Sequence, residues 1–218
     1  NQALDPLPRG PIQLAEDRIS GRRPKPHDML SVIIPTRNSE RALVPTLGAL
    51  VPGATAGLIA EVLIADGGSQ DDTAAVADVA GCNFLMLEGS LAESLKAAVA
   101  SARMPWLMFL RPGTVLDAPW TSEVARFLQQ DDRQAPAAVF RRGGRETALR
   151  EILCAVATAV GAPPRREQGL LIAKHLYDTV GGHSERAGDP EHDLLRRVGR
   201  RRIVKLATQA FGGPLIAK

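Results

Sequence analysis

The chain has 218 residues, 44% of them hydrophobic, which fits one ordinary domain with a full core. Its 27 Lys and Arg residues against 24 Asp and Glu residues leave only a small positive excess, and one Tyr, two Trp and five Phe offer little to stack on bases. Nucleic acid is therefore disfavoured as a partner. No stretch approaches the roughly twenty apolar residues of a membrane span, which excludes a transmembrane helix.

Residues 1–28 carry five prolines and no sustained period, so we expect a flexible arm ahead of a single domain over 29–218. In the next part, short apolar runs alternate with segments in which the apolar residues recur at helical spacing. Strands are predicted at 30–35, 61–66, 83–88 and 106–110, and helices at 40–51, 71–80 and 91–102. This alternation predicts an α/β fold, a mainly parallel sheet with helices on both faces.

Beyond residue 115 the alternation is less regular, although both kinds of segment are still recognisable. Helices are predicted at 122–130, 145–160 and 190–198, and strands at 137–140, 169–174 and 202–207. The two cysteines, Cys82 and Cys154, lie apart among apolar or small residues and lack metal-ligand spacing. They are predicted to be buried, reduced thiols of a cytoplasmic protein.

Polar residues follow the first two predicted strands, where ligands bind in open parallel sheets. The first strand leads into PTRNSE, in which Asn38 or Ser39 suits a helix cap. The second ends in ADGGSQDDT, in which Asp66 could accept a hydrogen bond from a uracil imide or a ribose. A turn followed by a helix cap explains the same residues, and on their chemistry alone it is the preferred interpretation.

Five stretches taken together resemble family-2 glycosyltransferases, and in particular their small soluble bacterial branch. In chain order they are SVIIPTRN, EVLIADGGSQDDT, PWLMFLRPGTVL, QGLLIAKHLYDTVGGH and PEHDLLRRVGR, covering about residues 30–207. The resemblance implies the Rossmann-like nucleotide-diphospho-sugar transferase fold. It also implies transfer of a sugar from a UDP- or GDP-linked donor to an acceptor that the sequence does not identify.

The resemblance assigns roles to individual residues. Those expected at the donor site are Pro35, Thr36, Asn38, Asp66, Gly68, Ser69, Asp71 and Gly113. The strand that begins near Gln168 would border the acceptor. Glu191 would take the proton from the acceptor hydroxyl, with Asp193 two residues further on. Arg111 is counted with these catalytic residues on its own chemistry, because the family has an acidic residue in this region.

The sequence departs from the family pattern where a metal would bind. The family implies Mn²⁺ or Mg²⁺ held by an Asp-x-Asp motif, but Arg111 and Gly113 stand there, and neither is an oxygen ligand for a divalent cation. No metal ligand is therefore predicted. His183 and His192, near several acidic residues, are weighed as a replacement metal site that their spacing does not demand.

Two interpretations of Arg111 stay open. Its guanidinium could hold the diphosphate directly in place of a metal. It could instead neutralise a nearby acidic residue, such as Asp117 or Asp66, in a catalytically inactive protein that keeps the fold as a binding or scaffolding module. Arginines are concentrated in the second half of the chain, so peripheral contact with the inner face of a membrane stays open. A homo-oligomer stays open as well.

Overall fold

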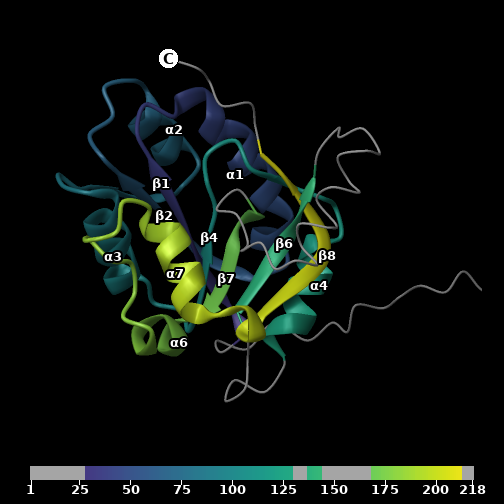
Figure 1. The fold of residues 1–218 in the computed structure, drawn as a ribbon. Helices are drawn as coiled ribbons and strands as arrows, with labels where there is room; N and C mark the ends of the chain where they lie inside the picture. Colours follow the sequence, from purple (N-terminus) through teal and green to yellow (C-terminus); the bar gives the residue numbers. More distant parts are fainter. Residues whose placement is uncertain (1–27, 130–136, 144–167, 213–218) are drawn as a thin grey trace, which may run out of the picture.

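The computed structural model describes residues 28–129, 137–143 and 168–212. These residues form an eight-stranded sheet with the order β3-β2-β1-β4-β7-β6-β8-β5. Figure 1 shows α7 in front of this sheet and α1 behind it, so helices cover both faces. The predicted helix at 145–160, Cys154 and nearly all of the predicted arm lie outside the described residues.

The first half of the described chain follows the predicted alternation. Its strands are β1 (Leu30–Thr36), β2 (Ile59–Asp66), β3 (Asn83–Met86) and β4 (Trp106–Phe109), and its helices are α1 (Glu40–Thr55), α2 (Thr73–Val79) and α3 (Leu91–Ser101). All four strands are parallel. β1 lies between β2 and β4, and its apolar run is completely buried, as expected for a central strand covered on both faces.

The register of these strands brings the polar loops together. Pro35 and Thr36 at the end of β1 pair with Ala65 and Asp66 at the end of β2, and Ile33 pairs with Phe109 at the end of β4. Parallel strands that end in register direct their following loops to the same edge of the sheet. This edge is where the sequence predicts ligand binding.

The second half is mixed rather than parallel. Its strands are β5 (Val115–Leu116), β6 (Ala137–Gly143), β7 (Leu170–Ala173) and β8 (Ile203–Phe211), and its helical segments are α4 (Trp120–Leu128), α6 (Lys174–Thr179), α7 (Pro190–Val198) and η3 (Arg200–Arg202). β7 is antiparallel to both β4 and β6, whereas β8 is parallel to β6 and antiparallel to β5. The mainly parallel arrangement therefore holds for the first four strands, and the α/β class holds throughout the described residues.

A glycine allows α1 to approach α4 closely. An added Cβ at Gly53 would lie 2.3 Å from the ring of Trp120, which is 1% exposed. The Trp120 indole N–H also donates to the carbonyl of Ala49, at 3.1 Å. The two helices are thus joined by a buried aromatic ring that leaves no space for a side chain on the α1 side.

Candidate functional site

Asp66 organises the loop that follows β2. Its side chain is completely buried and accepts hydrogen bonds from the hydroxyls of Thr36 (2.7 Å) and Ser69 (2.5 Å) and from the backbone N–H groups of Gly68 (3.0 Å) and Ser69 (2.7 Å). Burial by itself would raise the pKa of Asp66, but these hydrogen bonds outweigh it and lower the pKa. A carboxylate has about four acceptor positions, and all are used here. A contact between Asp66 and a base, which stays a prediction, would require one donor to turn away.

Asn38 connects the loop after β1 to the same network. It has a φ of +50°, the left-handed region that Asn tolerates better than most residues. Its backbone N–H donates to the Ser69 hydroxyl at 2.8 Å, and its side-chain oxygen accepts from the backbone N–H of Gln70 at 2.8 Å. The two polar loops are therefore held together by reciprocal hydrogen bonds.

Asp71 caps two helices at once. It accepts from the backbone N–H of Glu40 (3.1 Å), at the start of α1, and from the backbone N–H (3.1 Å) and hydroxyl of Thr73, at the start of α2. Ser39 occupies the N-cap position of α1, as predicted, but its hydroxyl makes no capping bond and the neighbouring loop supplies the acceptor. Five of the predicted donor-site residues thus form one hydrogen-bond network, Thr36, Asn38, Asp66, Gly68 and Ser69, and Asp71 holds the helices that follow the two loops.

Arg111 and Glu191 form an ion pair across the same edge of the sheet. Arg111 follows β4, Glu191 lies in the first turn of α7, and the guanidinium donates to the carboxylate. The two side chains are 32% and 12% exposed. Among the described residues, Arg111 Nε is the one buried side-chain polar atom without a hydrogen-bond partner. Of the two interpretations of Arg111, the pairing with a nearby acidic residue is observed, but the partner is Glu191 on α7 rather than Asp66 or Asp117.

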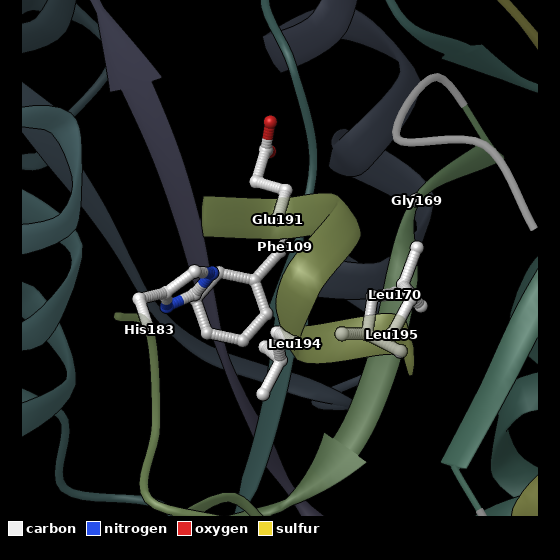
Figure 2. Close-up of a pocket in the computed structure, with 7 residues that line it drawn as sticks. All are labelled: Phe109, Gly169, Leu170, His183, Glu191, Leu194 and Leu195. Carbon is white, nitrogen blue, oxygen red and sulfur yellow. The ribbon is translucent and has the colours of Figure 1, made fainter. Parts of the chain in front are cut away.

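A small cavity lies beneath Glu191 (Figure 2). Its lining is mostly apolar and comprises Phe109, Gly169, Leu170, His183, Glu191, Leu194 and Leu195. Figure 2 shows the Glu191 carboxylate directed away from the leucines of α7, while the His183 ring lies beside Phe109. The volume of about 20 Å³ holds roughly one water molecule, so this cavity cannot itself contain a sugar nucleotide.

His183 is buried and neutral. It is 1% exposed, its Nδ1 lies 2.9 Å from the Tyr177 hydroxyl, and its own backbone N–H donates to the same oxygen at 3.1 Å. Burial lowers the pKa of His183 to about 4, and the positive charges of Arg197 and Lys96 act in the same direction. The described residues contain no group of three or more His, Cys, Asp and Glu side chains that could hold a metal, so the geometry does not support the replacement site with exposed His192.

The loop that carries His183 is held by α7. Arg197 donates to the carbonyls of Val180 and Gly182 (2.5 Å) and to the carboxylate of Asp193 (2.8 Å). Asp193 is therefore the counterion of Arg197, one turn along α7. Neither composition nor spacing singled out Arg197 among the many arginines of this region.

A second ion pair reaches the same loop from α3. Lys96 Nζ lies 2.6 Å from Glu185 Oε1, and both side chains are nearly half exposed. Nothing in the sequence pairs Lys96, in the predicted helix at 91–102, with Glu185. Their contact joins the first half of the chain to the segment between α6 and α7.

Two other predicted residues have roles in the fold. The backbone N–H of Gly113, at a φ of +86°, donates to the Thr46 hydroxyl (2.9 Å) and to the Ala42 carbonyl (2.8 Å). The Gln168 side chain donates to the carbonyl of Phe140 at 3.0 Å. These contacts anchor the turn after β4 to α1 and the start of β7 to β6. Substrate contacts by Gly113 and Gln168 stay predictions.

The family profile for glycosyl transferase family 2 matches residues 31–180. The chain belongs to glycosyl transferase family 2. The predicted family and fold are confirmed. Arg111 and Gly113 therefore replace the usual Asp-x-Asp motif in a member of this family. Among curated proteins, none matches the sequence significantly.

Solved glycosyltransferases share the fold of this family-2 chain. One is glucosyl-3-phosphoglycerate synthase from Mycobacterium tuberculosis, in complex with Mn²⁺, UDP and glucosyl-3-phosphoglycerate. It is 20% identical with a TM-score of 0.60, and the match covers 82% of this chain and 69% of the synthase chain. TarS 1–349 from S. aureus is 17% identical with a TM-score of 0.63, and the match covers 85% of this chain and 60% of the TarS chain. PcManGT is a mannosyltransferase from Pyrobaculum calidifontis in complex with GDP-Man and Mn²⁺. It is 16% identical with a TM-score of 0.65, and the match covers 89% of this chain and 60% of the PcManGT chain. At these identities the likeness concerns the fold, and this chain spans 60% of the length of the latter two.

Proposed function

We propose that this protein transfers a sugar from a UDP- or GDP-linked donor to an acceptor, with Arg111 supplying the positive charge that a metal ion supplies elsewhere. The observation that carries the proposal is the position of Arg111, after β4 at the edge where β1 and β2 also end, with its guanidinium already paired to a carboxylate. Residues 111 and 113 do not fit a metal, because neither side chain offers an oxygen ligand.

The proposed reaction is a single displacement. The acceptor hydroxyl oxygen forms a bond to the anomeric carbon while its proton passes to Glu191, and the bond from that carbon to the diphosphate oxygen breaks. The leaving diphosphate keeps the electron pair of the broken bond, and the Arg111 guanidinium stabilises its charge through paired N–H donors. Asp193 contributes through its bond to Arg197, which holds the loop beside Glu191.

The network at the ends of β1 and β2 supports donor binding in this proposal. Thr36, Asn38 and Ser69 bring hydroxyl and amide groups to the edge of the sheet where Arg111 lies. Their mutual hydrogen bonds fix the loops before any ligand arrives, which reduces the entropy lost on binding. We therefore assign this network to the nucleoside half of the donor and Arg111 to its diphosphate.

A second candidate function is a catalytically inactive binding or scaffolding module. Two observations favour it: Arg111 and Glu191 neutralise each other, and the cavity beside Glu191 holds roughly one water molecule. If this candidate is correct, no nucleotide will bind at the edge of the sheet, and the fold will serve a partner protein instead.

Calorimetric titration with UDP and GDP distinguishes these functions. We expect binding in the presence of EDTA, and a loss of about 10- to 100-fold in Arg111→Gln, since a hydrogen bond to a charged group contributes about 1.5–3 kcal/mol. Arg141→Gln removes the same charge from an exposed position on β6 and should bind like the wild type. Glu191→Gln should abolish transfer. Binding that requires Mn²⁺ would refute the role of Arg111, and no nucleotide binding at all would favour the inactive module.

The proposal extends to the cellular location. Among the described residues, no helix is both long enough and apolar enough to cross a membrane. We propose a bacterial cytoplasmic protein that contacts the inner face of the membrane through η3, whose three arginines, Arg200–Arg202, are all exposed. Exposed basic residues attract anionic lipid, so sedimentation with anionic vesicles, but not with neutral ones, is expected at low salt. Sedimentation velocity will decide whether the protein is a homo-oligomer.

A further inference from the structure

Two ion pairs connect the first half of the chain to the segment between α6 and α7. Lys96 on α3 pairs with Glu185, and Arg111 after β4 pairs with Glu191. In both pairs the cation belongs to the parallel half of the sheet and its helices, while the carboxylate belongs to residues 185–191. Figure 1 shows this segment passing beside α3 before it enters α7.

The two cations act on the same small region. His183 borders the cavity together with Glu191, the partner of Arg111. Lys96 pairs with Glu185, which follows His183 by two residues in the same segment. Lys96 and Arg111 therefore both bind the segment 183–191, which leads into α7.

The two carboxylates are presented from a braced segment. Arg197 binds the carbonyls of Val180 and Gly182 at one end of it, and the Asp189 side chain caps α7 at the other by accepting from the backbone N–H of His192, at 3.2 Å. Glu185 and Glu191 thus face the two cations from a segment that is fixed at both ends.

We propose that Lys96 and Arg111 together form the diphosphate site, and that Glu185 and Glu191 occupy it in place of the phosphates until a donor binds. This inference rests on the proposed function and adds a second cation to it. Arg binds phosphate through its planar fork and Lys as a compact charge, so the pair suits two linked phosphates.

At Lys96 the exchange of a carboxylate for a phosphate costs little. Lys96 and Glu185 are 43% and 49% exposed, and ion pairs at such exposure contribute little to stability. A diphosphate carries several negative charges and can engage both cations at once, whereas each carboxylate engages one. The exchange also frees Glu191 from Arg111. Donor binding therefore releases the base for the acceptor, and the base stays neutralised when no donor is present.

The test uses two probes, inorganic pyrophosphate and UDP, titrated into the 218-residue protein in EDTA. Lys96→Gln should weaken both by about tenfold or more, because one charge-assisted contact is lost. Glu185→Gln should tighten both by up to about fivefold, since Lys96 no longer has a competing carboxylate. Lys205→Gln removes the same charge from an exposed position on β8 and should leave both affinities unchanged.

The double variant of Lys96→Gln and Glu185→Gln makes the test specific. If Glu185 acts through Lys96, its gain disappears in the double variant; a gain that persists would show a general charge effect and overturn the exchange. If Lys96→Gln binds both probes like the wild type while Arg111→Gln does not, the inference fails and the proposed function stands. If the wild type binds neither probe, both fail.

Discussion

Mild acid should destabilise this protein through a single histidine. His183 is buried against Tyr177 and Phe109, and its pKa is about 4 in the folded protein, compared with about 6.5 for an unperturbed histidine. Between these values the unfolded chain binds a proton that the folded protein excludes. The free energy of unfolding therefore falls as the pH falls through this window, and His183 has no such effect above it.

The size of this effect follows from the difference between the two pKa values. At about 1.4 kcal/mol per pKa unit, His183 accounts for about 3 kcal/mol in total, of which about 2 kcal/mol is lost between pH 7 and pH 4.5. Carboxylates with lowered pKa values, such as Asp66 and Glu61, also begin to lose their stabilising contribution near pH 4.5, so the effect of His183 is read from the comparison with a variant that lacks the imidazole.

Urea unfolding at pH 7 and pH 4.5 measures this difference. His183→Phe keeps a flat ring against Phe109 and Tyr177 but cannot bind a proton, so its stability should change about 2 kcal/mol less than that of the wild type. His192→Phe is the matched control, because His192 is exposed and should leave the difference unaltered. An equal fall in the wild type and in His183→Phe would refute the assignment, whatever the absolute stability of the variant.

Two further substitutions test the packing and the loop network, each by urea unfolding at pH 7. Gly53→Ala should lower the free energy of unfolding by about 1–3 kcal/mol, because the added Cβ would overlap the buried Trp120 ring. Gly48→Ala is the control in the same helix: its Cβ meets no atom within 4 Å, so it should raise the free energy of unfolding by about 0.5–1 kcal/mol. Asp66→Asn should lower the free energy of unfolding by about 1–3 kcal/mol, because the buried hydrogen-bond donors lose a charged acceptor. Asp72 is exposed and its side chain makes no capping bond, so Asp72→Asn should change the free energy of unfolding by less than about 0.5 kcal/mol. Destabilisation by Gly48→Ala or Asp72→Asn equal to that of its partner would contradict the corresponding argument.

Local features of the sequence determined the α/β class and the first four strands. Short apolar runs separated by helically spaced ones are properties of neighbouring residues, and β1 to β4 each overlap a predicted strand. The direction of β7 could not be predicted in this way, because a buried run such as Leu170–Ala173 has the same composition whether its neighbour is parallel or antiparallel. Strand direction depends on how distant segments are connected.

The ion pairs of the candidate site were decided by tertiary structure alone. Arg111 and Glu191 were both identified from the sequence, yet they are 80 residues apart, and nothing local indicates that they meet. Lys96 and Glu185 are 89 residues apart. The sequence specifies which charges the chain carries, but the path of α7 across the sheet determines which of them become partners, because a charge is neutralised by whatever lies within a few ångströms in space.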